Sequence, residues 1–135
     1  MVKMTGVYSG EKHCEATHEP SGSHLETDAP RDNQGRGEKF SPTDLVGAAL
    51  GTCILTTLAI VLEKDGVDLK NSLFTVEKVM ASDPRRISAL TVRLNLPKNI
   101  PDNQREKIAH VANNCPVKKS MHPDLAATIE IFYDL

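Results

Sequence analysis

The sequence predicts an α+β fold in a single domain spanning residues 1–135. Strand-like segments occur in blocks rather than in alternation with helices, which disfavours a doubly wound sheet. One long run without charged residues, at positions 45–62, is typical of a helix buried between layers. Hydrophobic residues make up 39% of the chain but aromatic residues only 4%, so the core must be aliphatic. A short chain of this kind is expected to gain stability by oligomerisation.

The N-terminal region alternates short polar and apolar runs. Ser9 and Gly10 form the first turn signal, and a second lies at positions 20–23. The segments around these turns predict three short antiparallel strands. These are Val2–Tyr8, Lys12–His18 and His24–Ala29.

A polar, charged and glycine-bearing loop follows at Pro30–Lys39. Two interpretations of it are open. It is either a solvated connection or a loop that brings Arg31 or Arg36 over a site, since loops often carry functional side chains.

The clearest element is a helix. Ser41 suits its N-cap, Pro42 suits its first helical position, and Asp44 can reach back to the amide of the cap. The helix is expected to end near Lys64, just before Gly66. Apolar residues surround most of its circumference, so it should be covered on several sides. Its length raises the question of a membrane span, but its glycines, threonines and cap favour the core of a soluble protein.

After this helix the sequence predicts a hairpin, an amphipathic helix, a short helix and a final strand. Leu90, Val92 and Leu94 fall on one side of the second hairpin strand, a pattern typical of a half-buried strand. The expected bounds are Val67–Ala81 and Ile87–Leu96 for the hairpin, Pro101–Asn113 for the helix, Cys115-Pro116 for the start of the short helix, and Ala126–Tyr133 for the last strand.

Charge and composition exclude several classes of protein. Sixteen basic and 18 acidic residues are interspersed and give a net charge of −2, so there is no electrostatic footprint for nucleic acid. Aromatic residues are too few for base stacking. We see no secretory signal near Met1, and three cysteines without one predict a reducing, cytoplasmic location. No cofactor and no metal ion are expected.

Two of the cysteines lie in unlike surroundings. Cys115 precedes Pro116 and should lie at a helix N-cap, where backbone N–H groups favour the thiolate, so we expect its pKa to fall below that of a free thiol. Cys53 lies in an apolar helix, which does not favour the thiolate unless a cation is brought to it. The small neighbours Gly51 and Thr52 would let another backbone or a substrate approach Cys53 closely.

Two thiols brought together by folding suit a peroxidatic and resolving pair. One thiolate attacks the O–O bond of a peroxide and becomes a sulfenic acid, and the second thiol condenses with it to a disulfide. The alternative is that both cysteines are small, inert core residues.

Two segments resemble the cysteine motifs of the OsmC/Ohr family, in its OsmC-like branch. They are Phe40-Ser-Pro-Thr-Asp-Leu-Val-Gly-Ala-Ala-Leu-Gly-Thr-Cys53 and Asn114-Cys-Pro-Val-Lys-Lys-Ser120. The resemblance implies antiparallel sheets wrapped around central helices in an intertwined homodimer. It also implies thiol-dependent reduction of organic or inorganic hydroperoxides in oxidative-stress defence, recycled by a dithiol reductant, without metal or haem. By motif match, Cys53 would be the peroxidatic thiol and Cys115 the resolving thiol.

The resemblance implies an arginine, held by a glutamate, that activates the first cysteine. The glutamate position, ten residues before Cys53, is Thr43 here, and Asp44 is adjacent to it. The early strands contain no arginine, so Arg31, Arg36 or Lys12 are the candidates for the activating cation.

Other constellations are weaker. Cys14 is interpreted as a spare thiol on a strand, and His122 as part of a turn rather than a base for Cys115. Zinc ligation by His13, Cys14 and His18 with the distant cysteines lacks a recognisable spacing. An acyl-transfer enzyme would need an oxyanion-hole motif, which we do not find. The main alternative to the peroxidase is a non-catalytic OsmC-like dimeric module for binding or redox sensing.

Overall fold

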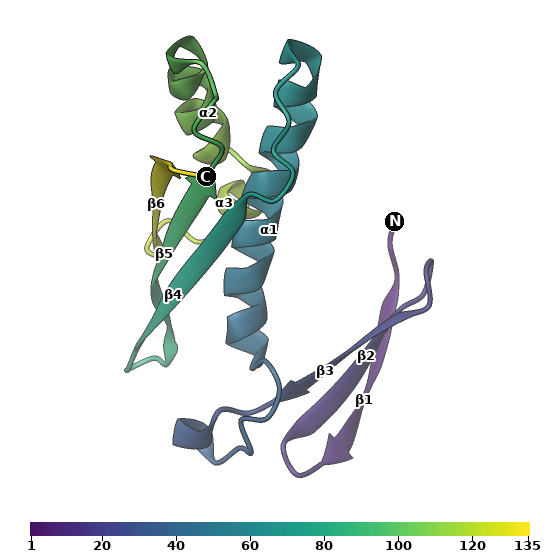
Figure 1. The fold of residues 1–135 in the computed structure, drawn as a ribbon. Coiled ribbons are helices and arrows are strands. Elements are labelled where there is room, and N and C mark those ends of the chain that lie inside the picture. Colours follow the sequence, from purple (N-terminus) through teal and green to yellow (C-terminus); the bar gives the residue numbers. More distant parts are fainter. The chain divides into compact units, whose positions relative to one another are not determined.

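The structure is a computed structural model that describes all 135 residues. They form two compact units, Met1–Val46 and Gly47–Leu135, and the long helix α1 begins in the first and continues through the second. The elements comprise two three-stranded sheets and the helices α1, α2 and α3, which confirms the α+β class (Figure 1).

The N-terminal unit contains an antiparallel sheet with the strand order β1-β2-β3. Its strands are β1, Met4–Gly10; β2, His13–His18; and β3, Ser23–Asp28. The first turn lies beyond the Ser9-Gly10 signal, because Glu11 and Lys12 both adopt a φ of 56° and so form the tight connection between β1 and β2. Gly22, with a φ of 71°, serves the second turn.

The segment after β3 folds back on the end of that strand. It begins with a single 3₁₀ turn at Arg31–Asn33. The amide of Asp28 donates to the carbonyl of Phe40 at 3.1 Å, and the amide of Gly37 donates to Ala29 at 3.2 Å. These backbone hydrogen bonds hold the polar loop against the end of β3.

Helix α1 spans Pro42–Leu62 and begins with the predicted cap. The amide of Ser41 donates to Asp44 Oδ2 at 2.8 Å, and the amide of Asp44 donates to Ser41 Oγ at 3.0 Å. These reciprocal bonds satisfy two backbone donors at the helix start. A 3₁₀ turn, Glu63–Asp65, follows, and Gly66 with a φ of 71° ends it as predicted.

One side of α1 packs on the second sheet, β4-β5-β6. The strands are β4, Leu73–Ala81; β5, Arg86–Leu96; and β6, Ala126–Tyr133 (Figure 1). Fully buried leucine and isoleucine side chains recur along α1 with helical spacing, and alternate residues of β5 are buried opposite them. These residues are Leu50, Ile54, Leu58 and Leu62 in α1, and Leu90, Val92, Leu94 and Leu96 in β5.

Two features of this sheet differ from the sequence-based expectation. Strand β4 starts at Leu73 rather than Val67, because Asp68 accepts a hydrogen bond from the amide of Lys70 and Asn71 adopts a φ of 70°, which makes a turn. Strands β4 and β5 form the expected antiparallel hairpin, whereas β6 pairs with β5 in parallel.

The parallel pairing needs a crossover connection, and two helices supply it. After β5 the chain forms a 3₁₀ turn at Asp102–Gln104, then α2, Arg105–Ala112, then the short α3, Pro116–Lys119. Ile108 and Ala112 are the buried residues of α2, and they anchor this connection in the core.

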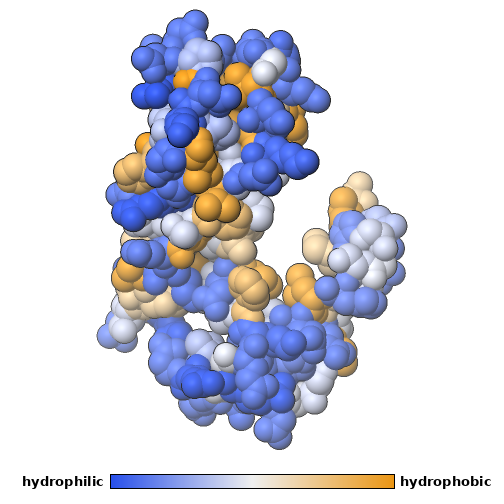
Figure 2. All heavy atoms as spheres, in the orientation of Figure 1, coloured by the Kyte–Doolittle hydropathy of each residue, from blue (hydrophilic) through white to orange (hydrophobic).

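Part of α1 is not covered by the β4-β5-β6 unit, Gly47–Leu135. Ala59 and Ile60 are exposed, so the expectation of cover on several sides is not met within one chain. By length and composition alone, the helical stretch Pro42–Asp65 could cross a membrane, and core helices of soluble proteins pass the same test. Figure 2 shows apolar residues, in orange, on the surface of both units.

Of the two glycines of α1, Gly51 makes the closer approach to the sheet. A Cβ at this position would lie 2.6 Å from Cε2 of Phe74, whereas one at Gly47 would lie 3.3 Å from Val76 Cγ1. The close approach expected at Gly51 is thus made by a side chain of β4.

We therefore predict different outcomes for two glycine substitutions in α1. Gly51→Ala should lower the free energy of unfolding by about 1–3 kcal/mol, because the ring of Phe74 must move. Gly47→Ala is the matched control and should destabilise less than Gly51→Ala, because Val76 need move only slightly and alanine favours the helix by about 1 kcal/mol. Urea denaturation measures both, and equal destabilisation would contradict this packing.

Candidate functional site

Cys53 lies in the middle of α1 on the border of its buried stripe. Its buried neighbour Ile54 faces the sheet, while Cys53 itself is half-buried. The Sγ atom of Cys53 lies 3.9 Å from Oγ1 of Thr57, one helical turn further along. The thiol is therefore fixed by a rigid helix yet keeps some access to solvent.

Cys115 lies at the N-cap of α3, as the sequence predicts. Its φ of −67° and ψ of 152° are extended, and Pro116 takes the first helical position. The carbonyl of Cys115 accepts the amide of Lys119 at 3.0 Å. Cys115 is 0% exposed, so the N-cap that holds it is enclosed by the core.

The fold brings the thiols of Cys53 and Cys115 together. They lie close enough for Cys53 to raise the pKa of Cys115 through hydrogen bonding and charge, although they come from distant parts of the sequence. Both are free thiols. A pair of this kind can exchange a proton and, after oxidation of either sulfur, can condense to a disulfide.

Burial raises the pKa of the Cys115 thiol above its ordinary value. The backbone N–H groups of Lys118 and Val117 lower this pKa, but they do not offset burial, and the neighbouring Cys53 raises the pKa further. The prediction of a lowered pKa at Cys115 is therefore wrong. The N-terminus of a helix favours the thiolate, but burial removes the sulfur from water, and here this desolvation is the larger effect.

The lysines that follow Cys115 do not change the direction in which its pKa shifts. The Nζ atom of Lys118 donates to Oδ1 of Asn113 at 2.7 Å. The helix behind the cap is also short, because α3 spans only Pro116–Lys119. Cys115 is thus held as a protonated thiol that can donate a hydrogen bond to the sulfur of Cys53.

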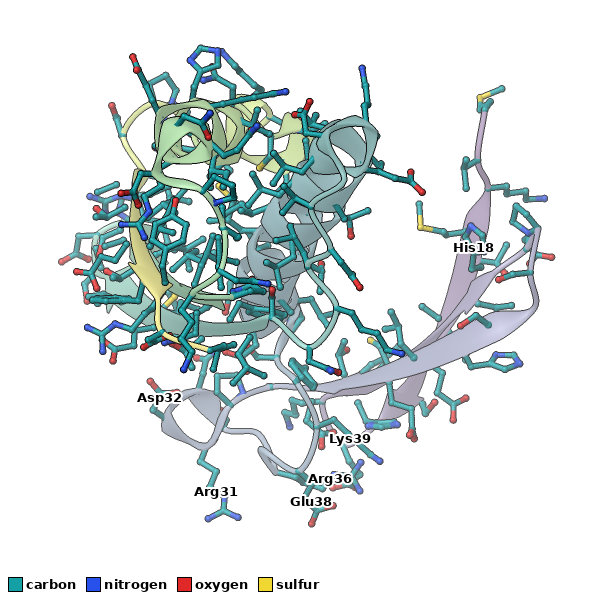
Figure 3. The ribbon with its side chains drawn as sticks, turned by 45° about the horizontal axis from the view of Figure 1, so that its top comes forward. His18, Arg31, Asp32, Arg36, Glu38 and Lys39 are labelled. Atoms are coloured by element: carbon teal, nitrogen blue, oxygen red, sulfur yellow. The ribbon has the colours of Figure 1, made fainter.

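The two candidate activating arginines lie in the N-terminal unit. Arg36 Nη2 donates to Asp28 Oδ1 at 3.3 Å, and Arg31 Nε donates to the carbonyl of Arg36 at 3.2 Å. Figure 3 shows Arg36 grouped with Glu38 and Lys39, whereas the side chain of Arg31 extends away from them. Each arginine therefore has a partner within its own unit.

The residues at the family's glutamate position serve the start of α1. Thr43 Oγ1 lies 3.1 Å from Ser41 Oγ, and the carboxylate of Asp44 accepts the amide of Ser41. Asp44 therefore acts as the cap partner that the sequence predicts.

The secondary candidates have local surroundings of their own. Cys14 is exposed on β2, and His122 is exposed with its Nδ1 accepting the amide of Asp124 at 3.1 Å, as expected for a turn. His18 hydrogen-bonds Ser21 at 2.6 Å and lies at the far end of its strand from the loop residues in Figure 3.

One pair was missed at the sequence level. His13 and Asp28 are both buried and are joined by a hydrogen bond of 2.7 Å between Nδ1 and Oδ1. They are direct partners in the register of β2 and β3. In the sequence, His13 lies near the start of one predicted strand and Asp28 near the end of the next. If these strands form a hairpin, the two residues become neighbours, and this is the only signal that could have revealed the pair.

Comparisons with known proteins identify the family to which this fold belongs. The fold that carries the two thiols is of the OsmC-like α+β class. The family model described as OsmC-like protein matches residues 35–130, and the chain belongs to this family. Among curated proteins, none matches.

Several solved structures share the fold. One is a Psychrobacter arcticus 273-4 protein with a proposed role in the osmotic stress induced and detoxification response. Its sequence is 37% identical to this one and the TM-score is 0.92, and the match covers 97% of this chain and 96% of that one. The organic hydroperoxide resistance protein OsmC of Legionella pneumophila is 16% identical with a TM-score of 0.77, over 98% and 96% of the two chains. An organic hydroperoxide resistance protein of Elizabethkingia anophelis is 12% identical with a TM-score of 0.79, over 99% and 96%.

We predict that Cys53→Ala lowers the pKa of Cys115, because the substitution removes both the hydrogen-bonding effect and the electrostatic effect of Cys53. The ¹³Cβ resonance of Cys115, followed by NMR as a function of pH, measures this change. Cys14→Ser is the matched control and should leave the titration unchanged. A Cys115 that titrates below the usual range of a thiol in the wild type would contradict the account.

Proposed function

We propose that this protein is a thiol-dependent peroxidase that reduces organic or inorganic hydroperoxides through Cys53 and Cys115. The single observation that carries the proposal is the contact between the two thiols, one half-buried on α1 and one enclosed at the N-cap of α3. Family membership and the similarity to organic hydroperoxide resistance proteins of Legionella and Elizabethkingia support hydroperoxides as the class of substrate.

In the proposed reaction, the thiolate of Cys53 attacks one oxygen of the hydroperoxide. The O–O bond breaks, Cys53 becomes a sulfenic acid, and the leaving alkoxide takes a proton to become an alcohol. The thiol of Cys115 then attacks the sulfenic sulfur, forming a disulfide and releasing water. A dithiol reductant returns both cysteines to thiols by exchange and is itself oxidised to a disulfide.

The raised pKa of Cys115 supports this division of roles. A thiol that keeps its proton near neutral pH is a poor first nucleophile but can donate a hydrogen bond to a neighbouring sulfur. Cys53 is the more accessible of the two, as a peroxide requires. The order of attack implied by the sequence motifs therefore agrees with the burial of the two thiols.

Treatment of the reduced protein with cumene hydroperoxide tests the proposal. We expect peroxide consumption and a Cys53–Cys115 bridge mapped by mass spectrometry. Cys115→Ser should stop at a sulfenic acid on Cys53 that dimedone traps, Cys53→Ser should abolish consumption, and Cys14→Ser is the matched control with unchanged behaviour. Neither consumption nor a bridge in the wild type would overturn the proposal.

The alternative is an OsmC-like module for binding or redox sensing without turnover. The engagement of Arg36 with Asp28 and of Arg31 with a backbone carbonyl favours this alternative, since the partners of both arginines differ from the glutamate that the resemblance implies. Multiple turnovers with dithiothreitol as reductant would exclude it, whereas a single stoichiometric oxidation would favour it.

We further propose a cytoplasmic homodimer whose interface includes the uncovered side of α1. Ile60 is 64% exposed in the single chain. Beside it lies a hollow of about 670 Å³ that is lined largely by apolar side chains, including Leu55 and Val67. Exposed apolar surface of this kind on a soluble domain is typical of an interface.

Substitution of Ile60 tests the interface. Ile60→Asp should shift the protein from dimer to monomer in sedimentation analysis, because a carboxylate cannot be buried there without a partner. Val79→Asp, at a position that is 55% exposed on β4, is the matched control and should remain dimeric. A monomeric wild type, or dimers unaffected by Ile60→Asp, would contradict this assignment.

A further inference from the structure

Three metal-ligating side chains meet on one face of the N-terminal sheet, apart from the two cysteines. His13 and Glu15 alternate along β2, and Glu26 pairs with Glu15 across β3. Alternate residues of a strand share a face, so the pairing brings all three together. One ligand atom from each lies within 4.8 Å of the others.

Asp28 orients the imidazole of His13. Its Oδ1 lies 2.7 Å from His13 Nδ1, and its Oδ2 accepts the amide of Glu38 at 3.2 Å. Asp28 is 1% exposed, and the side chain of His13 is 10% exposed, so the pair is fixed by burial. A carboxylate on Nδ1 holds the proton there and turns the Nε2 lone pair outward, as the carboxylates behind metal-bound histidines do.

The outward nitrogen faces a carboxylate. His13 Nε2 lies 3.3 Å from Glu26 Oε1. Two ligands bound to Zn²⁺ at about 2.0–2.1 Å in tetrahedral geometry lie about 3.3 Å apart, so these two atoms already have the spacing of a shared cation. Glu15 is exposed, and its side chain can rotate to become the third ligand.

We propose that His13, Glu15 and Glu26 bind a divalent transition-metal cation of the Zn²⁺ class, with Asp28 as the residue that positions His13. One imidazole nitrogen and two carboxylate oxygens form a ligand set that such ions accept. Both glutamates also line a hollow of about 570 Å³ on this sheet, together with Thr5, Thr17 and His24. The remaining coordination position is thus open to water or to a small ligand from this hollow.

Lys39 is the group that competes with the cation. Its Nζ lies 3.2 Å from Oε2 of Glu26, and both side chains are nearly half exposed. An exposed ion pair of this kind contributes little, so a divalent ion can displace the ammonium group at small cost. It follows that removal of Lys39 should strengthen binding of the metal.

Isothermal calorimetry with Zn²⁺ on the full, reduced chain tests the site. We expect one ion per chain, affinity weakened by about tenfold or more in Glu15→Gln and in Asp28→Asn, and affinity raised in Lys39→Ala. Glu106→Gln, an exposed glutamate on α2, is the matched control for the loss of one carboxylate. Thermal melting verifies that each variant is folded.

Two further measurements separate this site from the cysteines. Co²⁺ bound at the site should give weak d–d absorption bands without thiolate charge transfer, and the spectrum should persist in Cys53→Ser. In ¹⁵N NMR, Zn²⁺ should shift the Nε2 resonance of His13 and leave the proton on Nδ1. Thiolate bands, an affinity insensitive to both Glu15→Gln and Lys39→Ala, or no binding at millimolar Zn²⁺ would each overturn the proposal.

Discussion

The packing of α1 on the β4-β5-β6 sheet is the constraint on which the rest of the structure depends. Leu50, Ile54, Leu58 and Leu62 are all fully buried along one side of the helix, so its rotation about its own axis is fixed. Gly51 lets the ring of Phe74 come close enough to set the depth of this contact. Cys53 lies next to this row of buried residues. The crossover connection through α2 and α3 places Cys115 close to it.

A balance between two physical effects sets the direction in which the pKa of Cys115 shifts. The N-cap of a helix favours a thiolate, whereas removal of the sulfur from water favours the protonated thiol. At Cys115 burial is the larger effect, and the nearby Cys53 adds to it. A site built in this way favours the protonated form of the enclosed sulfur, which is consistent with the proposed attack on substrate by the accessible one.

Local sequence signals predicted the elements that local interactions determine. The cap formed by Ser41 and Asp44, the stop at Gly66 and the one-sided burial of β5 all follow from neighbouring residues. Three features depend on contacts between distant segments: the parallel pairing of β6, the pKa of Cys115, and the buried pair of His13 with Asp28. The desolvation that raises the pKa of Cys115 can be assessed only once the fold is known. The two thiols themselves were identifiable because their motifs are recognisable, whereas neither candidate arginine could be matched to them by sequence.

The central claim is that Cys53 and Cys115 form one redox unit within a single chain. A redox titration of the Cys14→Ser protein against mixtures of reduced and oxidised dithiothreitol tests it most directly. The account predicts a single two-electron transition, with both thiols lost together and no covalent link between chains. Oxidation of one cysteine without the other, or disulfides that form only between chains, would contradict it.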